Sequence, residues 1–235
     1  MKSTITEAAA AIAASVVVLI VLSVAPVRAV AQSGNSIATS FQNSGQNSGQ
    51  NSGSRPKENQ RRSSTTLDRA LVEAAESGDV SALDKLLGIG ADVNCALSGD
   101  GSPLIVAARR GRLAAVRALL DRGADPNMPV TGDGNPLIMA AREGHEDVTA
   151  LLLDRGANID QVVPGDENAL IQASGQGQLQ VVKLLISRGA DVNVRVWVDR
   201  GSQRLVGEWR TPLSMARKGG HQAVIAVLLA AGARE

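Results

Sequence analysis

The sequence is poor in the residues that usually fill a globular core. Its 235 residues include one Phe, two Trp and no Tyr. A core built around large rings is therefore excluded, whereas helices that pack through Ala, Leu and Val fit the composition. Together with 24 glycines and abundant alanine, the lack of aromatic residues favours a repeat or helical array.

Cysteine and histidine are also scarce. The single cysteine, Cys95, excludes an intramolecular disulfide and a cysteine-based zinc site, and we expect it to be a small inert residue on a connecting loop. The only histidines, His145 and His221, follow equivalent glycines in separate repeats, so we expect them to be structural rather than to share a metal. A nucleophile would need a base and an orienting acid, and Cys95 has no histidine in a corresponding unit. We therefore predict no enzyme, no cofactor and no metal site.

An excess of charge of one sign is lacking as well. The formal net charge is +1, so the overall charge of the protein does not favour binding to nucleic acid or to an anionic surface. Residues 67–235 carry slightly more acidic than basic side chains, whereas nucleic-acid binding needs a concentrated positive face. We expect a protein partner and no nucleic acid, and we expect the chain itself to be a monomer.

The first segment predicts export. Residues 8–24 form an apolar run without a charge, and the small residues Ala29 and Ala31 then stand where signal peptidase accepts them. We expect cleavage between Ala31 and Gln32. The run is close to the roughly 17 residues that span a bilayer, so an uncleaved helical anchor is the alternative. Residues 1–31 are thus a signal peptide or signal anchor, and the protein is periplasmic or secreted, or anchored by this single segment and facing the periplasm.

The next segment, residues 32–66, predicts a disordered linker. It consists largely of Gln, Asn, Ser and Gly, with copies of Gln-Asn-Ser-Gly starting at Gln42, Gln46 and Gln50. Such a composition buries too little apolar surface to offset chain entropy. Flexible-coil scaling gives roughly 34 residues a reach of about 30 Å, which suits a tether.

From Leu67 onward the chain repeats itself every 33 residues. A fifth copy is displaced by 43 residues, so ten residues are inserted before it. The markers of the repeat are a single glycine and a Gly-Ala pair, found at Gly78, Gly111, Gly144, Gly177 and Gly220, and at Gly90-Ala91, Gly123-Ala124, Gly156-Ala157, Gly189-Ala190 and Gly232-Ala233.

Each repeat predicts two short helices. Ser102-Pro103, Asn135-Pro136 and Thr211-Pro212 place a capping side chain before a proline, which is well tolerated at the first helical position. The second helix carries an apolar stripe and ends at the Gly-Ala pair. One unit has too small a core, and stacking supplies it. We predict an all-α solenoid of five helix-turn-helix units with finger loops, at about 67–97, 98–130, 131–163, 164–196 and 197–235.

The third unit shows all the markers at once. It reads Asn135-Pro136-Leu137-Ile138-Met139-Ala140-Ala141-Arg142-Glu143-Gly144-His145, followed by Val148, Leu151-Leu152-Leu153 and Arg155-Gly156-Ala157. This pattern resembles the ankyrin repeat, and the resemblance extends over about 169 residues. It implies binding of another protein through finger tips and inner helices. The sequence departs from the family pattern in two ways, which should weaken the polar ladder between repeats. The histidine of the family's threonine-proline-leucine-histidine box is replaced by Ile105, Ile138, Ile171 and Ser214, and Ala169 replaces the proline in the fourth unit.

Residues 160–168 and 208–216 resemble the ankyrin tail of some bacterial membrane zinc peptidases of the beta-lactam-sensor type. The peptidase motif H-E-x-x-H is absent, because His145-Glu146 has no second histidine after it. The catalytic half therefore does not carry over. The leading hypothesis is a non-catalytic binding module. The alternatives are a regulatory or recruiting component of such a peptidase system, and a protective scaffold or immunity factor.

Transferring the family's inner-helix positions to this sequence gives a basic row. The two residues before each periodic glycine include Arg109, Arg142 and Lys218, and the row is interrupted at Gly175. A local basic stripe on a mildly acidic body suits an acidic patch of a protein partner.

The insertion, near residues 194–210, predicts an extended two-stranded finger. On the first arm, valines at every second position from Val194 to Val198 alternate with other residues, and a turn follows at residues 200–202. The returning arm carries Leu205, Val206 and Trp209. Both tryptophans, Trp197 and Trp209, lie here beside Arg195, and Trp and Arg are enriched at binding hot spots. We expect these three residues and the basic row to form a protein-binding patch. The alternative is that the two tryptophans face each other and merely hold the hairpin together.

Overall fold

The computed structural model describes residues 55–97, 101–199 and 207–234. These residues belong to one compact unit, Asn51–Glu235. The predicted signal segment with its cleavage site at Ala31 and Gln32, and the predicted linker as far as residue 54, lie outside the described residues.

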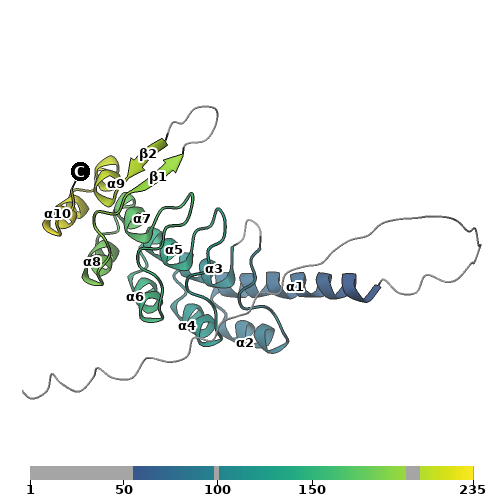
Figure 1. Ribbon diagram of the computed structural model, residues 1–235. Helices are drawn as coiled ribbons and strands as arrows, with labels where there is room; N and C mark the ends of the chain where they lie inside the picture. Colours follow the sequence, from purple (N-terminus) through teal and green to yellow (C-terminus); the bar gives the residue numbers. More distant parts are fainter. Residues whose placement is uncertain (1–54, 98–100, 200–206, 235) are drawn as a thin grey trace, which may run out of the picture. The chain divides into compact units, whose positions relative to one another are not determined.

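Ten helices in the described residues form five consecutive pairs (Figure 1). The first helix begins upstream of Leu67, where the repeat was predicted to start. The pairs are α1 (Arg55–Ser77) with α2 (Val80–Gly88), α3 (Pro103–Arg109) with α4 (Leu113–Asp121), α5 (Pro136–Glu143) with α6 (Glu146–Asp154), α7 (Ala169–Gly175) with α8 (Leu179–Ser187), and α9 (Pro212–Lys218) with α10 (Gln222–Ala230).

The pairs stack into two layers. The first helix of each pair packs against the first helices of its neighbours, and the second helices pack against one another in the same way. The fifth pair follows this rule despite the insertion before it, since α9 contacts α7 and α10 contacts α8. The predicted all-α solenoid of five helix-turn-helix units is therefore confirmed.

The helix starts confirm the predicted caps. Ser102, Asn135 and Thr211 have extended backbones, and each side chain accepts a hydrogen bond from the amide three residues on. Asn168 does the same for α7, although Ala169 replaces the usual proline. Such a cap contributes about 1 kcal/mol. At Thr211 a second hydrogen bond completes a capping box, because the Ser214 side chain accepts from the Thr211 amide.

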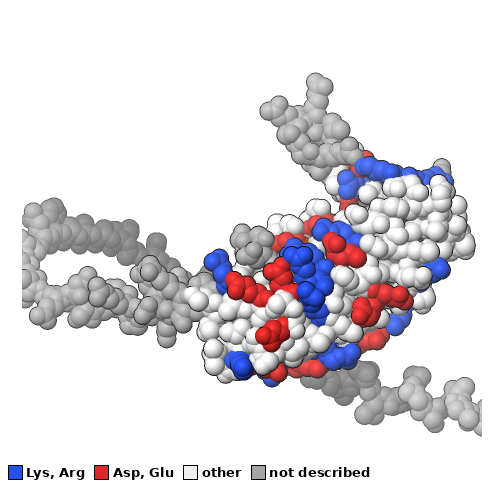
Figure 2. All heavy atoms as spheres, turned by 180° about the vertical axis from the view of Figure 1, so that it is seen from behind, with Lys and Arg blue, Asp and Glu red and all other residues white. Residues whose placement is uncertain are grey.

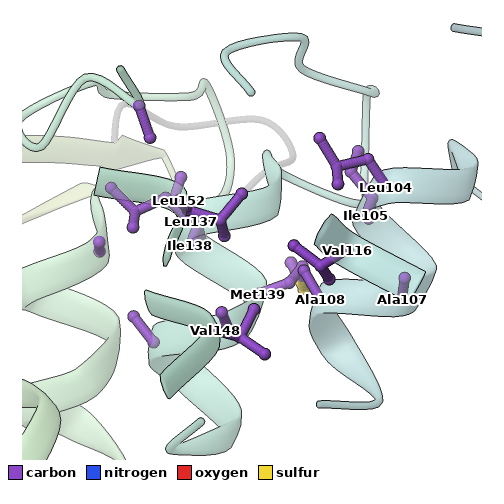
Figure 3. Close-up of a cluster of buried hydrophobic side chains, with 14 of the residues drawn as sticks. Leu104, Ile105, Ala107, Ala108, Val116, Leu137, Ile138, Met139, Val148 and Leu152 are labelled. Atoms are coloured by element: carbon purple, nitrogen blue, oxygen red, sulfur yellow. The ribbon is translucent and has the colours of Figure 1, made fainter. Parts of the chain in front are cut away.

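Small side chains let the first-helix layer close up. Ala107 and Ala108 of α3 and their counterparts Ala140 and Ala141 of α5 are fully buried. Larger apolar side chains fill the space around them; Figure 3 labels Leu104, Ile105, Val116, Leu137, Ile138, Met139, Val148 and Leu152. Fully burying one Leu or Ile contributes roughly 1.5–3 kcal/mol, so this core needs no aromatic ring.

A row of hydrogen bonds joins each unit to the next across the periodic glycine. A side chain at the start of each second helix reaches a carbonyl oxygen of the preceding unit, and a Cβ on Gly111 would lie 2.6 Å from the ring of His145. These bonds supply polar contacts between repeats although the family's threonine-proline-leucine-histidine box has no histidine here. Both histidines of the chain, His145 and His221, take part in the row. Its four bonds are Arg112 Nε to Glu76 O (3.0 Å), His145 Nε2 to Arg109 O (3.1 Å), Gln178 Nε2 to Arg142 O (3.0 Å) and His221 Nε2 to Gly175 O (3.0 Å).

Asparagines at the finger bases form a second row. Asn94 and Asn127 each donate to a carbonyl 29 residues further on, at Gly123 and Gly156. Asn193 donates to Gly232 O at 3.3 Å across 39 residues. The same bond is thus kept, and the ten inserted residues are looped out of the stack.

The insertion forms the predicted two-stranded finger. Strands β1 (Val196–Asp199) and β2 (Gly207–Arg210) pair antiparallel, with Trp197 opposite Trp209. The three other fingers are much shorter, and each is closed by a single bridge, at Leu97 with Gly101, Val130 with Gly134, and Val163 with Glu167.

Candidate protein-binding surface

The two faces of the β1–β2 hairpin differ in chemistry. Alternation along a strand places Arg195, Trp197 and Trp209 on one face, and all three are exposed. Val196, Val198 and Arg210 occupy the other face and are half-buried. The largest apolar side chains of the hairpin therefore point outward, which is the reverse of a hairpin that only covers a core. We call Arg195, Trp197 and Trp209 the aromatic face.

The two tryptophans pack against each other and remain accessible. Their ring centroids lie 5.3 Å apart with an interplanar angle of 65°, an edge-to-face arrangement. The Trp197 ring also lies over Gly207, where a Cβ would collide with it. Such a pair contributes about 0.5–1.5 kcal/mol, so it does help to hold the hairpin. Trp197 is nevertheless 47% exposed and Trp209 is 54% exposed, which leaves a fixed apolar surface for a partner.

Arg195 lies over the ring of Trp209. Its guanidinium carbon lies 5.1 Å from the centroid of the Trp209 ring, within the range of a cation–π interaction. A cation–π contact does not use the N–H groups as hydrogen-bond donors to an oxygen, so these groups can still donate to a partner. The contact helps to position Arg195, which has no acidic partner among the described side chains.

The half-buried face of the hairpin is anchored to the third short finger. Arg210 Nη1 pairs with Oε1 of Glu167, which is only 1% exposed. Arg210 Nε also pairs with Glu208 at 2.9 Å. Burial would lower the pKa of Arg210, but its hydrogen bonds to Glu167 and Glu208 outweigh burial and raise the pKa above its usual value. The anchor therefore keeps Arg210 charged and fixes the hairpin against the stack.

Glu167 is a functional residue that sequence reasoning missed. Its backbone φ of 60° is left-handed, as at the equivalent Gly101 and Gly134, and a non-glycine residue there costs about 1 kcal/mol. The carboxylate also accepts a hydrogen bond of 2.6 Å from Gln172 Nε2. The only signal in the sequence was the loss of the last glycine in this finger. The ion pair with Arg210 offsets the strain at this position.

The predicted basic row is largely neutralised by its neighbours. Arg109 lies 3.8 Å from Asp133, Arg142 lies 3.2 Å from Glu143, and Lys218 lies 3.3 Å from Glu208. Lys218 thus joins the hairpin through Glu208, whereas no ion pair among the described residues links Arg109 or Arg142 to it. On the face turned to the viewer in Figure 2, Lys and Arg are intermixed with Asp and Glu in the middle, and a broad area without charge covers the end that carries α9 and α10.

Cys95 is buried, with 7% of its surface exposed. Burial, and then the charges of Asp68 and Asp92, raise the pKa of its thiol to about 12, so the thiol is far from a nucleophile. In the described ranges, no group of three or more His, Cys, Asp and Glu side chains is arranged to hold a metal ion. Likewise, no helix within these ranges has the length and apolarity to span a bilayer.

Comparison with known proteins agrees with the stacked helix pairs. A family model described as ankyrin repeats in three copies matches residues 71–163 and 132–196. No curated protein matches the sequence. The resemblance of the last repeats to a zinc-peptidase tail stays a prediction, because the matched family is defined by the repeat alone. Ankyrin repeats are generally non-catalytic domains that bind other proteins. Since the matched residues make up more than half of the chain, the protein belongs to the ankyrin-repeat family.

Proposed function

We propose that this protein is an exported, non-catalytic module that holds a partner protein with the aromatic face of its hairpin and the adjoining inner helices. The observation that carries the proposal is the half-exposed tryptophan pair. Aromatic residues and arginine dominate binding hot spots, and elsewhere in the described residues the exposed large hydrophobic side chains stand singly, at Ile89, Val162 and Leu229.

The packing of the pair favours binding in a second way. A side chain that is fixed before association loses less entropy when a partner arrives. Trp197 is held by Trp209 and by the flat surface over Gly207, and the hairpin is held by Glu167. The aromatic face is therefore preorganised.

The basic row has a lesser part in this proposal. Because Arg109, Arg142 and Lys218 each have a nearby carboxylate, a partner would meet mixed charge rather than a positive stripe. Mixed charge at the edge of an interface affects specificity and association rate more than affinity. We expect these three residues to orient the partner and the aromatic face to supply most of the affinity.

The decisive experiment is capture by the full chain carrying Trp197→Ala and Trp209→Ala. Capture of the partner from an envelope extract should weaken at least tenfold, or roughly 1.4 kcal/mol. The melting temperature should hardly change, since the pair lies outside the stack. Ile89→Ala removes an apolar side chain that is even more exposed, at 66%, and is the control, expected to have no effect. Unchanged capture by the double variant, or lost capture with a large fall in melting temperature, would refute the proposal.

Export rests on the apolar segment at residues 8–24 and the small residues after it. N-terminal sequencing of the protein from an envelope fraction should begin at Gln32. Recovery of a chain that still begins at Met1 from membranes would establish the anchored alternative, and recovery from the cytoplasm would overturn export.

A further inference from the structure

A pocket of about 360 Å³ opens where the aromatic face of the hairpin meets α9. It lies beside the tryptophan pair and is distinct from the short fingers. The hairpin contributes Arg195, which precedes β1, and Trp209 of β2 to the lining. The cap residue and the first turns of α9 contribute Thr211, Leu213, Ser214 and Arg217.

The lining combines an apolar wall with positive charge. Trp209 and Leu213 supply the wall, and Leu213 is only 2% exposed, so it closes the pocket from below. Arg195 and Arg217 bring two guanidinium groups, and the described residues of the lining include no Asp or Glu. A ligand that fits must therefore have an apolar body and a negative charge.

The two lining hydroxyls serve mainly to shape the pocket. Thr211 Oγ1 accepts from the Ser214 amide, and Ser214 Oγ accepts from the Thr211 amide and donates to the Thr211 carbonyl. Their hydrogen bonds are used for the start of α9. The recognition of charge is left to the guanidinium groups.

Arg195 is suited to a planar anion. Its guanidinium carbon lies 5.1 Å from the centroid of the Trp209 ring, and the planar fork of N–H groups of an arginine matches the bidentate geometry of a carboxylate. Among the described side chains no carboxylate lies within ion-pair distance of Arg195, in contrast to Arg109, Arg142 and Lys218. The charge of Arg195 is therefore available for a ligand.

The apolar surface continues out of the pocket. Trp209 reaches from its wall to the edge-to-face contact with Trp197, and both rings are about half exposed. A chain that places an acidic group in the pocket would lay its neighbouring residue on these rings. The open surface between hairpin and α9 suits a chain that enters and leaves, rather than one that ends there.

From this geometry we infer that the pocket receives an Asp or Glu side chain of the partner protein, within a segment whose adjacent residue is large and apolar. The inference rests on the proposed function and adds the chemistry of the partner. The carboxylate binds between Arg195 and Arg217, and the apolar neighbour packs on Trp209 and Trp197.

Peptide display on the immobilised full chain tests the inference. One library of random dodecamers is displayed with both ends joined to the carrier, and a second has free C-termini. We expect the first library to yield peptides with an Asp or Glu next to Leu, Ile, Phe or Trp. Replacing that acid by its amide should weaken binding at least tenfold.

Substitutions in the pocket complete the test. Arg195→Gln should weaken the selected peptide at least tenfold, and Arg195→Lys should lose part of the affinity, because lysine keeps the charge without the planar fork. Arg188→Gln is the matched control, since Arg188 is an exposed arginine on the second-helix layer paired with Asp154, and it should leave binding unchanged. Melting temperatures should stay equal for all variants.

Several results would overturn the inference. These are selected peptides without an acid, binding that survives both Arg195→Gln and Arg217→Gln, enrichment only from the library with free C-termini, or no enrichment over the variant lacking both tryptophans. Partner capture that depends on the tryptophans but is insensitive to Arg195→Gln would refute the inference while leaving the proposed function intact. Capture that is insensitive to the tryptophans would refute the proposed function itself.

Discussion

The anchor between Glu167 and Arg210 allows a quantitative test of how the hairpin is held. Arg210→Met keeps the length of the side chain but removes the charge that faces a carboxylate with 1% exposure. Removing one partner of a buried ion pair destabilises a protein by about 3–5 kcal/mol. The Arg210 side chain is 20% exposed, so water replaces part of the loss, and we expect about 3 kcal/mol.

Glu167→Gly should cost much less. It removes the same ion pair, but glycine adopts the left-handed backbone without the strain of about 1 kcal/mol. Arg210 then keeps its contact with Glu208 and its access to water. We expect a net loss of about 1 kcal/mol or less. The double variant should match Glu167→Gly alone, so that the coupling energy between the two substitutions is about 3 kcal/mol, the whole loss caused by Arg210→Met.

Urea unfolding of the full chain, followed by circular dichroism at 222 nm, measures these differences. Arg188→Met is the control, because its pair with Asp154 is exposed and such pairs contribute about 1 kcal/mol at most. The reasoning fails if Arg210→Met is no more destabilising than Arg188→Met, or if the double variant loses the sum of both single losses.

Two further predictions concern buried groups. The Asn168 amide nitrogen is buried without a hydrogen-bond partner, whereas that of Asn135 donates to Gln161 at 2.9 Å. Because serine caps the equivalent helix at Ser102, thermal unfolding should show Asn168→Ser neutral or stabilising by up to about 1 kcal/mol, and Asn135→Ser destabilising by about 1 kcal/mol; equal shifts would contradict this. Burial raises the pKa of Cys95 to about 12, so a thiol reagent at pH 8 should label the folded chain at least about 100-fold more slowly than the urea-unfolded chain. The unfolded thiol ionises first, so stability should fall as the pH rises from about 9 towards 12, and Cys95→Ala should lack this component.

Much of the fold could be predicted because its signals are local. A capping side chain before a proline starts a helix wherever it occurs, and Ser102, Asn135 and Thr211 do so here. The 33-residue period then places the helices in equivalent positions. The alternation around Trp197 and Trp209 likewise predicted a hairpin, which the structure contains.

The site could be predicted only in part because its contacts are long-range. The missing glycine at Glu167 was visible in the sequence, but whether that carboxylate turns inward depends on Arg210, which lies 43 residues further along. The basic row was predicted from single positions, and the carboxylate that pairs with Arg109 stands in the next finger, at Asp133. The pocket arises only when α9 and the hairpin come together.

The looped-out insertion makes this protein a natural template for display engineering. Asn193 reaches Gly232 across the insertion as its counterparts do without one, and α9 packs on α7 in the ordinary way. The junction before α9 therefore tolerates a change of loop length without a change of stacking. A foreign loop grafted between Val194 and Thr211 would be presented at a fixed place on a rigid body, and a glutamate at position 167 with an arginine before Thr211 offers a ready clamp for its base.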